Sequence, residues 1–229
     1  MNKKVLFLFL GVVPLLGVAQ NRPFADKELQ RQVDEVYNRM TVEERTAQLF
    51  GIRPSEVMEN GKFSVEKCRK KYPHGFGHVC QFACGLDLDG NALRDFVKQV
   101  QFYLMNETSA AIPAIFHEEA ISGFAAKGAT VYPQQLGLSC TWNPELARRK
   151  TFETAKVMRA VGATFALSPM IDLIRTAHWS RIEESYGEDS YLTAAMGAAF
   201  VEGLQGCDWR TGVAACTKHF LGYGGGSRL

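Results

Sequence analysis

Apolar side chains recur along this chain with two different spacings. In four stretches they fall three or four positions apart, which is the spacing of residues on one face of a helix. The first three predicted helices span residues 26–40, 91–106 and 143–161. The fourth begins at residue 188 and ends at Gly203 or Gly206. Shorter apolar runs lie between them, and such runs are typical of strands buried on both faces. The predicted strands cover residues 74–79, 112–116, 163–167 and 212–220.

Residues that favour helix ends mark several of these boundaries. Asn143-Pro144 combines an N-cap with a proline at the first helical position, and Gly162 is expected to end the same helix. Thr41 begins a further short helix, with Glu44 placed to complete a capping box and Leu49-Phe50 as its apolar end. The sequence therefore places several helix ends to within a residue or two.

Strands and helices alternate along the predicted order, which indicates parallel strands joined by right-handed crossovers. Four strands are about half of the eight that close a β/α barrel. We therefore expect an α/β fold of the (β/α)8 TIM-barrel type, present only as roughly its first half. Residues 51–71 are polar and turn-rich, and none of the four predicted strands lies there.

Residues 1–19 are typical of a signal peptide. Two lysines precede an apolar run over residues 5–18, and small residues stand at the two positions that a signal peptidase recognises. We expect cleavage before Gln20 and export to the periplasm or the extracellular space. The run is short for a membrane span and no cysteine directly follows it, so no membrane anchor is expected.

Charge gives little indication of a macromolecular partner. Cleavage would remove two of the 26 basic residues and leave 24 against 24 acidic ones. A chain this close to neutrality gives no support to nucleic acid or an anionic membrane as a partner. The longest basic block, Arg69-Lys70-Lys71, is expected at a solvated helix end.

Six cysteines follow the predicted cleavage site. Cys68, Cys80 and Cys84 are close enough in sequence for one disulfide in an oxidising compartment, although the pairing does not follow from sequence. A zinc site on Cys80 and Cys84 would need a second ligand pair of matching spacing, and His117-Glu118-Glu119 lacks the second histidine of a zincin helix. We therefore predict no metal and no cofactor, and we expect Cys216 to be a buried thiol.

Polar side chains follow three of the predicted strands. Glu118 or Glu119 ends one strand, Asp172 and the loop 181–184 follow the next, and Lys218-His219 ends the last. Because parallel strands place their carboxyl ends at one edge of the sheet, we expect these side chains to converge on one rim. By itself, Lys218-His219 is equally compatible with packing, as a snorkelling lysine beside a core histidine.

The side chains expected at this rim are those that a sugar needs. Carboxylates accept hydrogen bonds from hydroxyl groups, Arg181 and Lys218 can donate to them, and the indole of Trp179 can cover an apolar sugar face. A phosphate would need a glycine-rich loop followed at once by a helix with Lys and Ser or Thr, and residues 222–227 lack that spacing. A sugar is therefore the ligand class that the residues favour.

Five ordered blocks of this sequence resemble glycoside hydrolase family 3, in its β-glucosidase/β-xylosidase branch. The resemblance covers roughly residues 41–226. The blocks are Ile112-Pro113 through Glu119 and Gly123, Gly128 to Gln134, Ser168-Pro169 with Asp172, Trp179-x-Arg181-x-x-Glu184 with Glu188-Asp189, and Ala214-x-x-x-Lys218-His219-Phe220. The Asp-Ser-His loop that marks the N-acetylglucosaminidase branch is absent after the Lys-His pair.

The resemblance implies roles for five residues. Glu119, Arg181, Lys218 and His219 would bind the sugar at the nonreducing end, and Glu184 would orient Arg181. The substrate would be an oligosaccharide or an aryl or alkyl β-glycoside, from which glucose or xylose is removed with retention. The chain departs from many relatives in having Ser122, Thr176 and Ser180 where those have His, Asp and Gly, and these departures bear on substrate preference more than on fold.

The two catalytic carboxylates that the resemblance implies are not found in this chain. Retaining hydrolysis uses a nucleophile and an acid/base about 5–5.5 Å apart. In the family the nucleophile lies in a Ser-Asp-Trp/Tyr-like motif after a later strand, and the acid/base usually comes from a second domain. The motif does not occur here, and Asp172 stands in a different one.

Residues 20–229 therefore resemble an incomplete N-terminal barrel domain. The C-terminal half of the barrel and a second domain would be needed for activity. An open sheet edge leads us to expect only marginal stability for these residues in isolation. The alternatives are a non-catalytic sugar-binding protein and an inactive truncated remnant.

Overall fold

The computed structural model describes residues 26–220, 222 and 223, so the predicted signal peptide lies outside the described residues. The chain divides into two compact units, residues 1–40 and residues 41–229. In the first unit, helix α1 (Lys27–Arg39) begins after Asp26, whose carboxylate accepts hydrogen bonds from the backbone N–H groups of Glu28 and Leu29. This confirms the helix predicted over residues 26–40.

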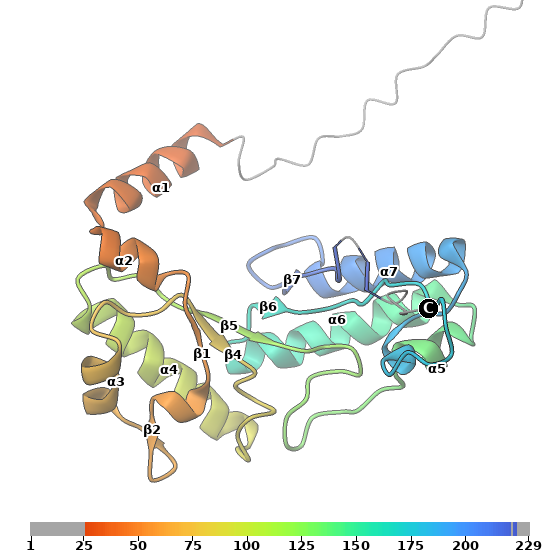
Figure 1. Ribbon diagram of the computed structural model, residues 1–229, viewed down its shortest axis with the longest axis horizontal. Helices are drawn as coiled ribbons and strands as arrows, with labels where there is room; N and C mark the ends of the chain where they lie inside the picture. The colour runs from red at the N-terminus through yellow and green to blue at the C-terminus, as the bar shows by residue number, and fades with distance from the viewer. Residues whose placement is uncertain (1–25, 221, 224–229) are drawn as a thin grey trace, which may run out of the picture. The chain divides into compact units, whose positions relative to one another are not determined.

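The second unit is built on a parallel sheet of five strands (Figure 1). Its strands are β1 (Gly51–Ile52), β4 (His78–Cys80), β5 (Ile115–Glu118), β6 (Phe165–Ala166) and β7 (Ala214–Ala215). Their order in space is β1-β4-β5-β6-β7, the same as their order in the chain, and every neighbouring pair is parallel. The sheet is therefore an α/β fold that covers about the first half of a β/α barrel.

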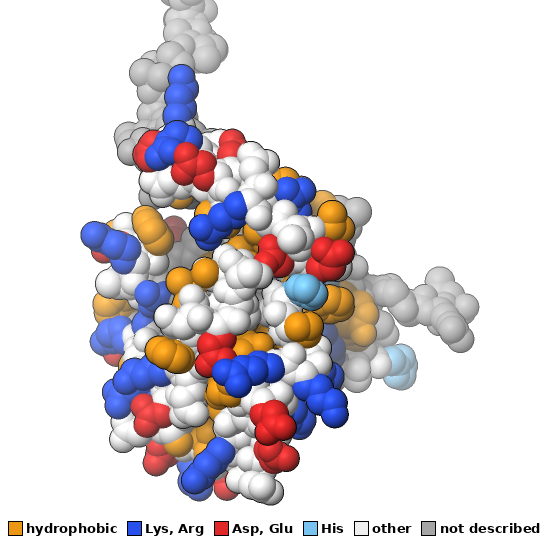
Figure 2. Space-filling model, turned by 90° about the vertical axis from the view of Figure 1, so that its left-hand side faces the viewer, with side chains coloured by type: hydrophobic (Ala, Val, Ile, Leu, Met, Phe, Trp, Pro, Cys, Tyr) orange, Lys and Arg blue, Asp and Glu red, His pale blue; other side chains and the backbone are white. Residues whose placement is uncertain are grey.

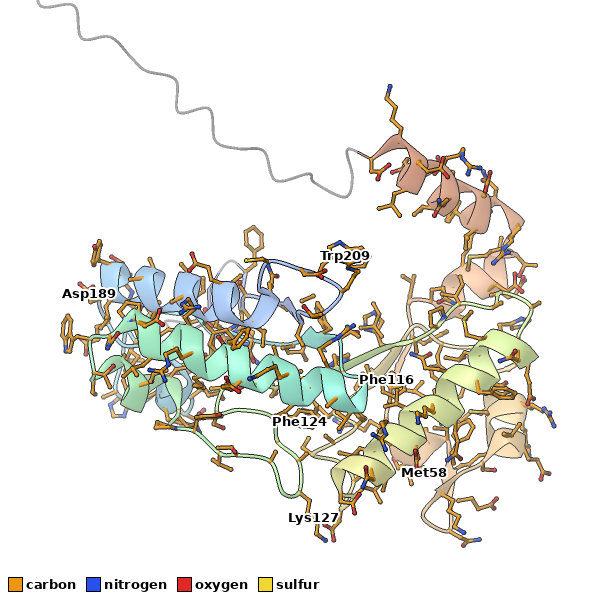
Figure 3. All side chains as sticks on the ribbon, turned by 180° about the vertical axis from the view of Figure 1, so that it is seen from behind. Met58, Phe116, Phe124, Lys127, Asp189 and Trp209 are labelled. Carbon is orange, nitrogen blue, oxygen red and sulfur yellow. The ribbon has the colours of Figure 1, made fainter. Side chains whose placement is uncertain are left out.

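Helix α2 (Val42–Ala47) precedes the first strand, and the other helices occupy the connections between the strands. These are α3 (Val65–Lys71), α4 (Gly90–Glu107), α5 (Gln135–Ser139), α6 (Pro144–Val161) and α7 (Ser190–Gln205). Asn143 caps α6 by accepting from the N–H of Glu145, and Gly162 ends that helix at φ 94°, as the sequence predicts. Helices α6 and α7 run side by side (Figure 1), and Asp189 caps the start of α7 (Figure 3). None of the described helices has the length and apolar character needed to span a bilayer.

Aromatic side chains form the centre of the core between the sheet and α4. The ring of Phe116 on β5, labelled in Figure 3, lies edge-on to Phe82 at 5.2 Å and to Phe96 at 6.3 Å. All three side chains are almost completely buried. Edge-to-face aromatic contacts of this kind add to the free energy gained by burying apolar surface.

Charged residues surround this core without collecting by sign. On the face shown in Figure 2, basic and acidic side chains are interspersed. Arg69 and Lys71 in the last turn of α3 pair with Glu107 and Glu56, each at 2.5 Å. The basic run does lie at a helix end, but its partners are neighbouring carboxylates rather than water alone.

The sequence missed three short strands, two 3-10 turns and one short helix. The five-stranded sheet has one strand more than predicted, because β1 lies in the turn-rich region 51–71. The other missed elements are the hairpin of β2 (Met58–Glu59) and β3 (Lys62–Phe63), the 3-10 turns η2 (Pro54–Glu56) and η3 (Ile182–Glu184), and helix α5. A strand of two residues carries no detectable period, and only its pairing with β4 defines it.

The predicted burial of the last strand is wrong. Val213 is fully buried, but Ala214 is exposed and Cys216 is half-buried, because β7 is paired only with β6 among the described strands. Leu49 and Phe50 are likewise exposed, since α2 ends before them.

The prediction of a disulfide is also wrong. All six cysteines carry free thiols, and Cys68 is buried within the core. Burial raises the pKa of the Cys68 thiol to about 12, which leaves it protonated and unreactive at neutral pH.

Candidate functional site

An ion pair joins the ends of two strands that are not neighbours in the sheet. Glu119 directly follows β5, and Lys218 lies shortly after β7. The Lys218 Nζ atom is 2.8 Å and 2.9 Å from the two carboxylate oxygens of Glu119. The backbone of Lys218 is also fixed, because its N–H donates to Pro169 and its carbonyl accepts from Ile171. This pair spans the carboxyl end of β6, at the rim where the sequence places the site.

Ser168 supports Glu119 from the intervening strand. Its hydroxyl donates to a carboxylate oxygen of Glu119 at 3.3 Å and accepts from the N–H of Ala120 at 3.0 Å. Ser168 is fully buried, so these bonds are shielded from water. The serine therefore holds both the side chain of Glu119 and the backbone that follows it.

The neighbouring carboxylate, Glu118, is buried and turned away from this rim. Its Oε1 accepts from the backbone N–H groups of Ala83 and Cys84 at 2.7 Å and 3.1 Å, and its Oε2 accepts from the N–H of Glu119. Burial raises the pKa of Glu118, and these N–H groups oppose that rise. Strand topology left Glu118 and Glu119 as alternatives, and the family resemblance implied Glu119. The structure places Glu119 at the rim and Glu118 under the turn after β4.

Arg181 and Glu184 form a bidentate pair on the loop that follows β6. The two nitrogen–oxygen distances are 2.7 Å and 2.5 Å, and both side chains are partly buried. Arg181 directly precedes the 3-10 turn η3 (Ile182–Glu184), and Glu184 is the last residue of this turn. Side chains three positions apart in a 3-10 turn lie on the same side. Hydrogen bonding to Arg181 lowers the pKa of Glu184, so this carboxylate stays ionised and holds the guanidinium in place.

His219 connects this pair to a buried aspartate. Its Nε2 lies 3.2 Å from a terminal nitrogen of Arg181, and its Nδ1 lies 2.6 Å from Oδ2 of Asp172. The backbone N–H of His219 donates to the same Asp172 oxygen at 3.1 Å. The residues expected to converge are thus brought together as two connected groups, Glu119 with Lys218, and Arg181 with Glu184, His219 and Asp172.

An aromatic side chain that the sequence did not reveal lies against the second group. The ring of Tyr223 has its centroid 5.0 Å from that of His219, and the guanidinium carbon of Arg181 lies 5.7 Å from it. Trp179 is in edge-on contact with the same ring at 5.9 Å. The only signal in the sequence is that Tyr223 stands between two glycines just after the Lys-His pair.

The chemistry of this rim is that of hydroxyl recognition. Carboxylate acceptors, guanidinium and ammonium donors and apolar ring faces are present in these two groups, and together they suit the hydroxyl groups and apolar faces of a sugar. Among the residues that the structure describes, no three His, Cys, Asp or Glu side chains are grouped so that they could hold a metal ion.

A parallel β/α sheet with polar residues at the carboxyl ends of its strands is the arrangement of a β/α-barrel domain, in which functional residues lie at that end. Comparison with known families agrees, because the glycosyl hydrolase family 3 N terminal domain matches residues 41–229. The chain belongs to glycosyl hydrolase family 3.

Individual relatives carry glycosidase names. The chain is 42% identical to a β-xylosidase of Formosa agariphila over 122 residues, which are 49% of this chain and 17% of that protein. It is 28% identical to a periplasmic β-glucosidase of Salmonella typhimurium over 89% of this chain and 25% of that protein. A solved β-glucosidase structure from Erythrobacter marinus superposes with a TM-score of 0.77 and 32% identity, over 85% of this chain and 26% of that one. The chain thus spans about a quarter or less of the length of these relatives.

Proposed function

We propose that this chain is the N-terminal barrel part of an exported glycoside hydrolase that removes β-linked glucose or xylose from nonreducing ends. The observation that carries the proposal is the presence of two bonded pairs at the carboxyl end of the sheet, Glu119 with Lys218 and Arg181 with His219. The names of the relatives, β-xylosidase and β-glucosidase, support the same two sugars.

Each rim residue has a defined part in holding the terminal sugar. Glu119 accepts hydrogen bonds from sugar hydroxyls, while Lys218 and Arg181 donate to hydroxyl oxygens. Glu184 keeps Arg181 oriented through the bidentate pair. The rings of Trp179 and Tyr223 offer apolar surface to the sugar ring.

Hydrolysis with retention needs two further carboxylates. The nucleophile and the acid/base must lie about 5–5.5 Å apart on either side of the scissile bond. These 229 residues contain no Ser-Asp-Trp or Ser-Asp-Tyr motif. We therefore assign these residues sugar binding, and the two catalytic carboxylates to a remaining half-barrel and a second domain. Domain limits at residues 1–19 and 20–229 belong to the same proposal, and N-terminal sequencing of the exported protein should begin at Gln20.

Calorimetric titration of the chain with glucose and with xylose tests the proposal. We expect saturable binding that weakens by roughly tenfold or more in Glu119→Gln and in Lys218→Met, because each change leaves a charged partner unpaired. Lys127→Met is the control, since its pair with Asp87 is largely exposed. Absence of binding to both sugars, or equal binding in all variants, would contradict the proposal.

A second candidate is a non-catalytic sugar-binding protein, in which the same residues would hold a sugar without turnover. Turnover of an aryl β-glucoside distinguishes the two. The 229 residues alone should give none, and the complete polypeptide that contains them should give turnover if it is a hydrolase. Binding without turnover in the complete polypeptide would establish the second candidate.

A further inference from the structure

Asp172 is a buried carboxylate behind the proposed sugar site, and it accepts from three nitrogen atoms of the site. Its Oδ2 accepts from the backbone N–H and from Nδ1 of His219, at 3.1 Å and 2.6 Å. Its Oδ1 accepts from the backbone N–H of Tyr223 at 2.6 Å. Only 5% of Asp172 is exposed, so these bonds are formed out of water.

We propose that Asp172 is a positioning residue that holds His219 as the neutral tautomer with its proton on Nδ1, so that Nε2 can only accept a hydrogen bond. The inference rests on the proposed sugar-binding function, and it adds to that function the means by which one donor is held in place. The single lone pair of Nε2 accepts from the guanidinium of Arg181, so His219 keeps this donor at the sugar site.

Two neighbours of His219 together define this tautomer, one at each ring nitrogen. An ionised carboxylate is only an acceptor, so the nitrogen 2.6 Å from Asp172 must carry the proton. A guanidinium is only a donor, so the nitrogen 3.2 Å from Arg181 must carry the lone pair. A doubly protonated ring would place two N–H groups against each other at the Arg181 contact. The geometry is therefore consistent with one protonation state alone.

The same carboxylate fixes the aromatic wall of the site. Through its bond to the N–H of Tyr223 it holds a ring whose centroid lies 5.0 Å from that of His219. An amide cannot replace it, because an asparagine side chain at this position would turn its one oxygen toward His219 and its N–H₂ group toward the N–H of Tyr223, or the reverse. Asp172→Asn should therefore disturb either His219 or Tyr223 while changing the side-chain volume very little.

Nitrogen NMR of the full chain, labelled with ¹⁵N in its histidine rings, tests the tautomer directly. The ring signals of His219 are distinguished from those of the other histidines, five in all, because they are missing from the spectrum of His219→Gln. We expect His219 to show a protonated Nδ1 and an unprotonated Nε2 at neutral pH in the wild-type chain. A protonated Nε2, alone or together with Nδ1, would overturn the inference. This measurement needs no sugar and no Asp172 variant that folds.

Glucose titrations test the consequence for binding. We expect Asp172→Asn to weaken glucose binding by roughly tenfold or more, because a buried donor loses its partner. The control is Ser185→Ala, which removes a hydroxyl bonded to the backbone carbonyl of Asp172 at 2.6 Å and leaves the carboxylate untouched. Its affinity should stay within about threefold of wild type. Equal effects of the two changes would show that Asp172 acts only through local packing.

Nitrogen NMR of Asp172→Asn and Ser185→Ala separates the holding of this tautomer from a general structural role. The form protonated on Nδ1 should lose its dominance in Asp172→Asn and should persist in Ser185→Ala, which keeps the carboxylate. Persistence of that form to the same extent in both variants would contradict the inference. If wild type binds no sugar at all, the proposed function fails, while the tautomer measurement still decides the assignment of His219.

Discussion

The ammonium group of Lys218 is bonded to both carboxylate oxygens of Glu119, a residue 99 positions earlier in the chain. The pair closes over the end of β6, where the hydroxyl of Ser168 supports the same carboxylate. Lys218 is only 13% exposed and Glu119 33% exposed, so the pair lies between a surface and a buried salt bridge. Its contribution to folding should therefore exceed that of an exposed pair, and loss of either partner should be costly.

A double-mutant cycle on this pair should reveal the coupling. Glu119→Gln and Lys218→Met should each lower the free energy of unfolding by about 1–3 kcal/mol, because each leaves a partly buried charge unpaired. The double variant should lose less than the sum of the two. Urea unfolding measures all three, and the exposed pair Lys127 and Asp87 provides the control cycle, with coupling of about 0–1 kcal/mol. Additive losses at Glu119 and Lys218 would show that the ion pair is not formed in solution.

Lys150 should make stability depend on alkaline pH. This lysine on α6 is buried, its Nζ donates to the backbone carbonyls of Ile121 and Pro133, and burial lowers its pKa from 10.5 to about 8. Above pH 8 the folded chain binds fewer protons at this site than the unfolded chain, so stability rises with pH until about 10.5.

The comparison with Lys150→Met isolates this effect. The free energy of unfolding of the wild-type chain should rise relative to that of Lys150→Met between about pH 8 and about pH 10, and the difference should be constant below about pH 7. Lys156→Met changes an exposed lysine on the same helix and is the matched control. If the free energy of unfolding of the wild-type chain does not rise relative to that of Lys150→Met in this range, Lys150 is not buried as a charged group.

Glu118→Gln should destabilise the chain by about 1–3 kcal/mol, because an amide presents a donor to N–H groups that now meet a carboxylate oxygen. Burial raises the pKa of Glu118, so the folded chain takes up this proton more readily than the unfolded chain. The wild-type chain should therefore become more stable relative to Glu118→Gln as pH falls from neutral toward that raised pKa. Denaturation at two or three pH values between about 5 and 7 checks the direction. A destabilisation by Glu118→Gln that grows with rising pH would contradict the raised pKa of Glu118.

Gly203 should tolerate no side chain. A Cβ atom at this position in α7 would collide with the backbone oxygen of Arg148 and the hydroxyl of Thr151 on α6. Gly203→Ala should lower the free energy of unfolding by about 1–3 kcal/mol, as overpacking between helices does. Gly137→Ala in α5 is the matched control, because its nearest neighbour would be 3.8 Å away, and it should be neutral or stabilising by up to about 1 kcal/mol. A small effect at Gly203 would mean that α6 and α7 can separate.

Local sequence signals located the longer elements well. Asn143, Pro144 and Gly162 define both ends of α6, and Thr41 with Glu44 forms the predicted capping box. These signals succeed because a cap is satisfied by atoms only a few residues away. The same approach failed at β1, whose two residues form a strand only by pairing with β4, and at the cysteines, where closeness in sequence did not bring thiols together.

The sequence by itself determined the alternation of strands and helices and the set of polar residues at the strand ends, since both follow from local periodicity and from parallel topology. Strand topology did not decide between Glu118 and Glu119, because adjacent residues on a strand point to opposite sides and the end of the strand was uncertain by a residue or two. Only the family resemblance implied Glu119. Only the tertiary structure placed Glu119 against Lys218, put Glu118 under the turn after β4, and showed Asp172 bonded to His219 and Tyr223. These contacts join segments far apart in the chain, and their geometry depends on how the whole sheet and its helices pack.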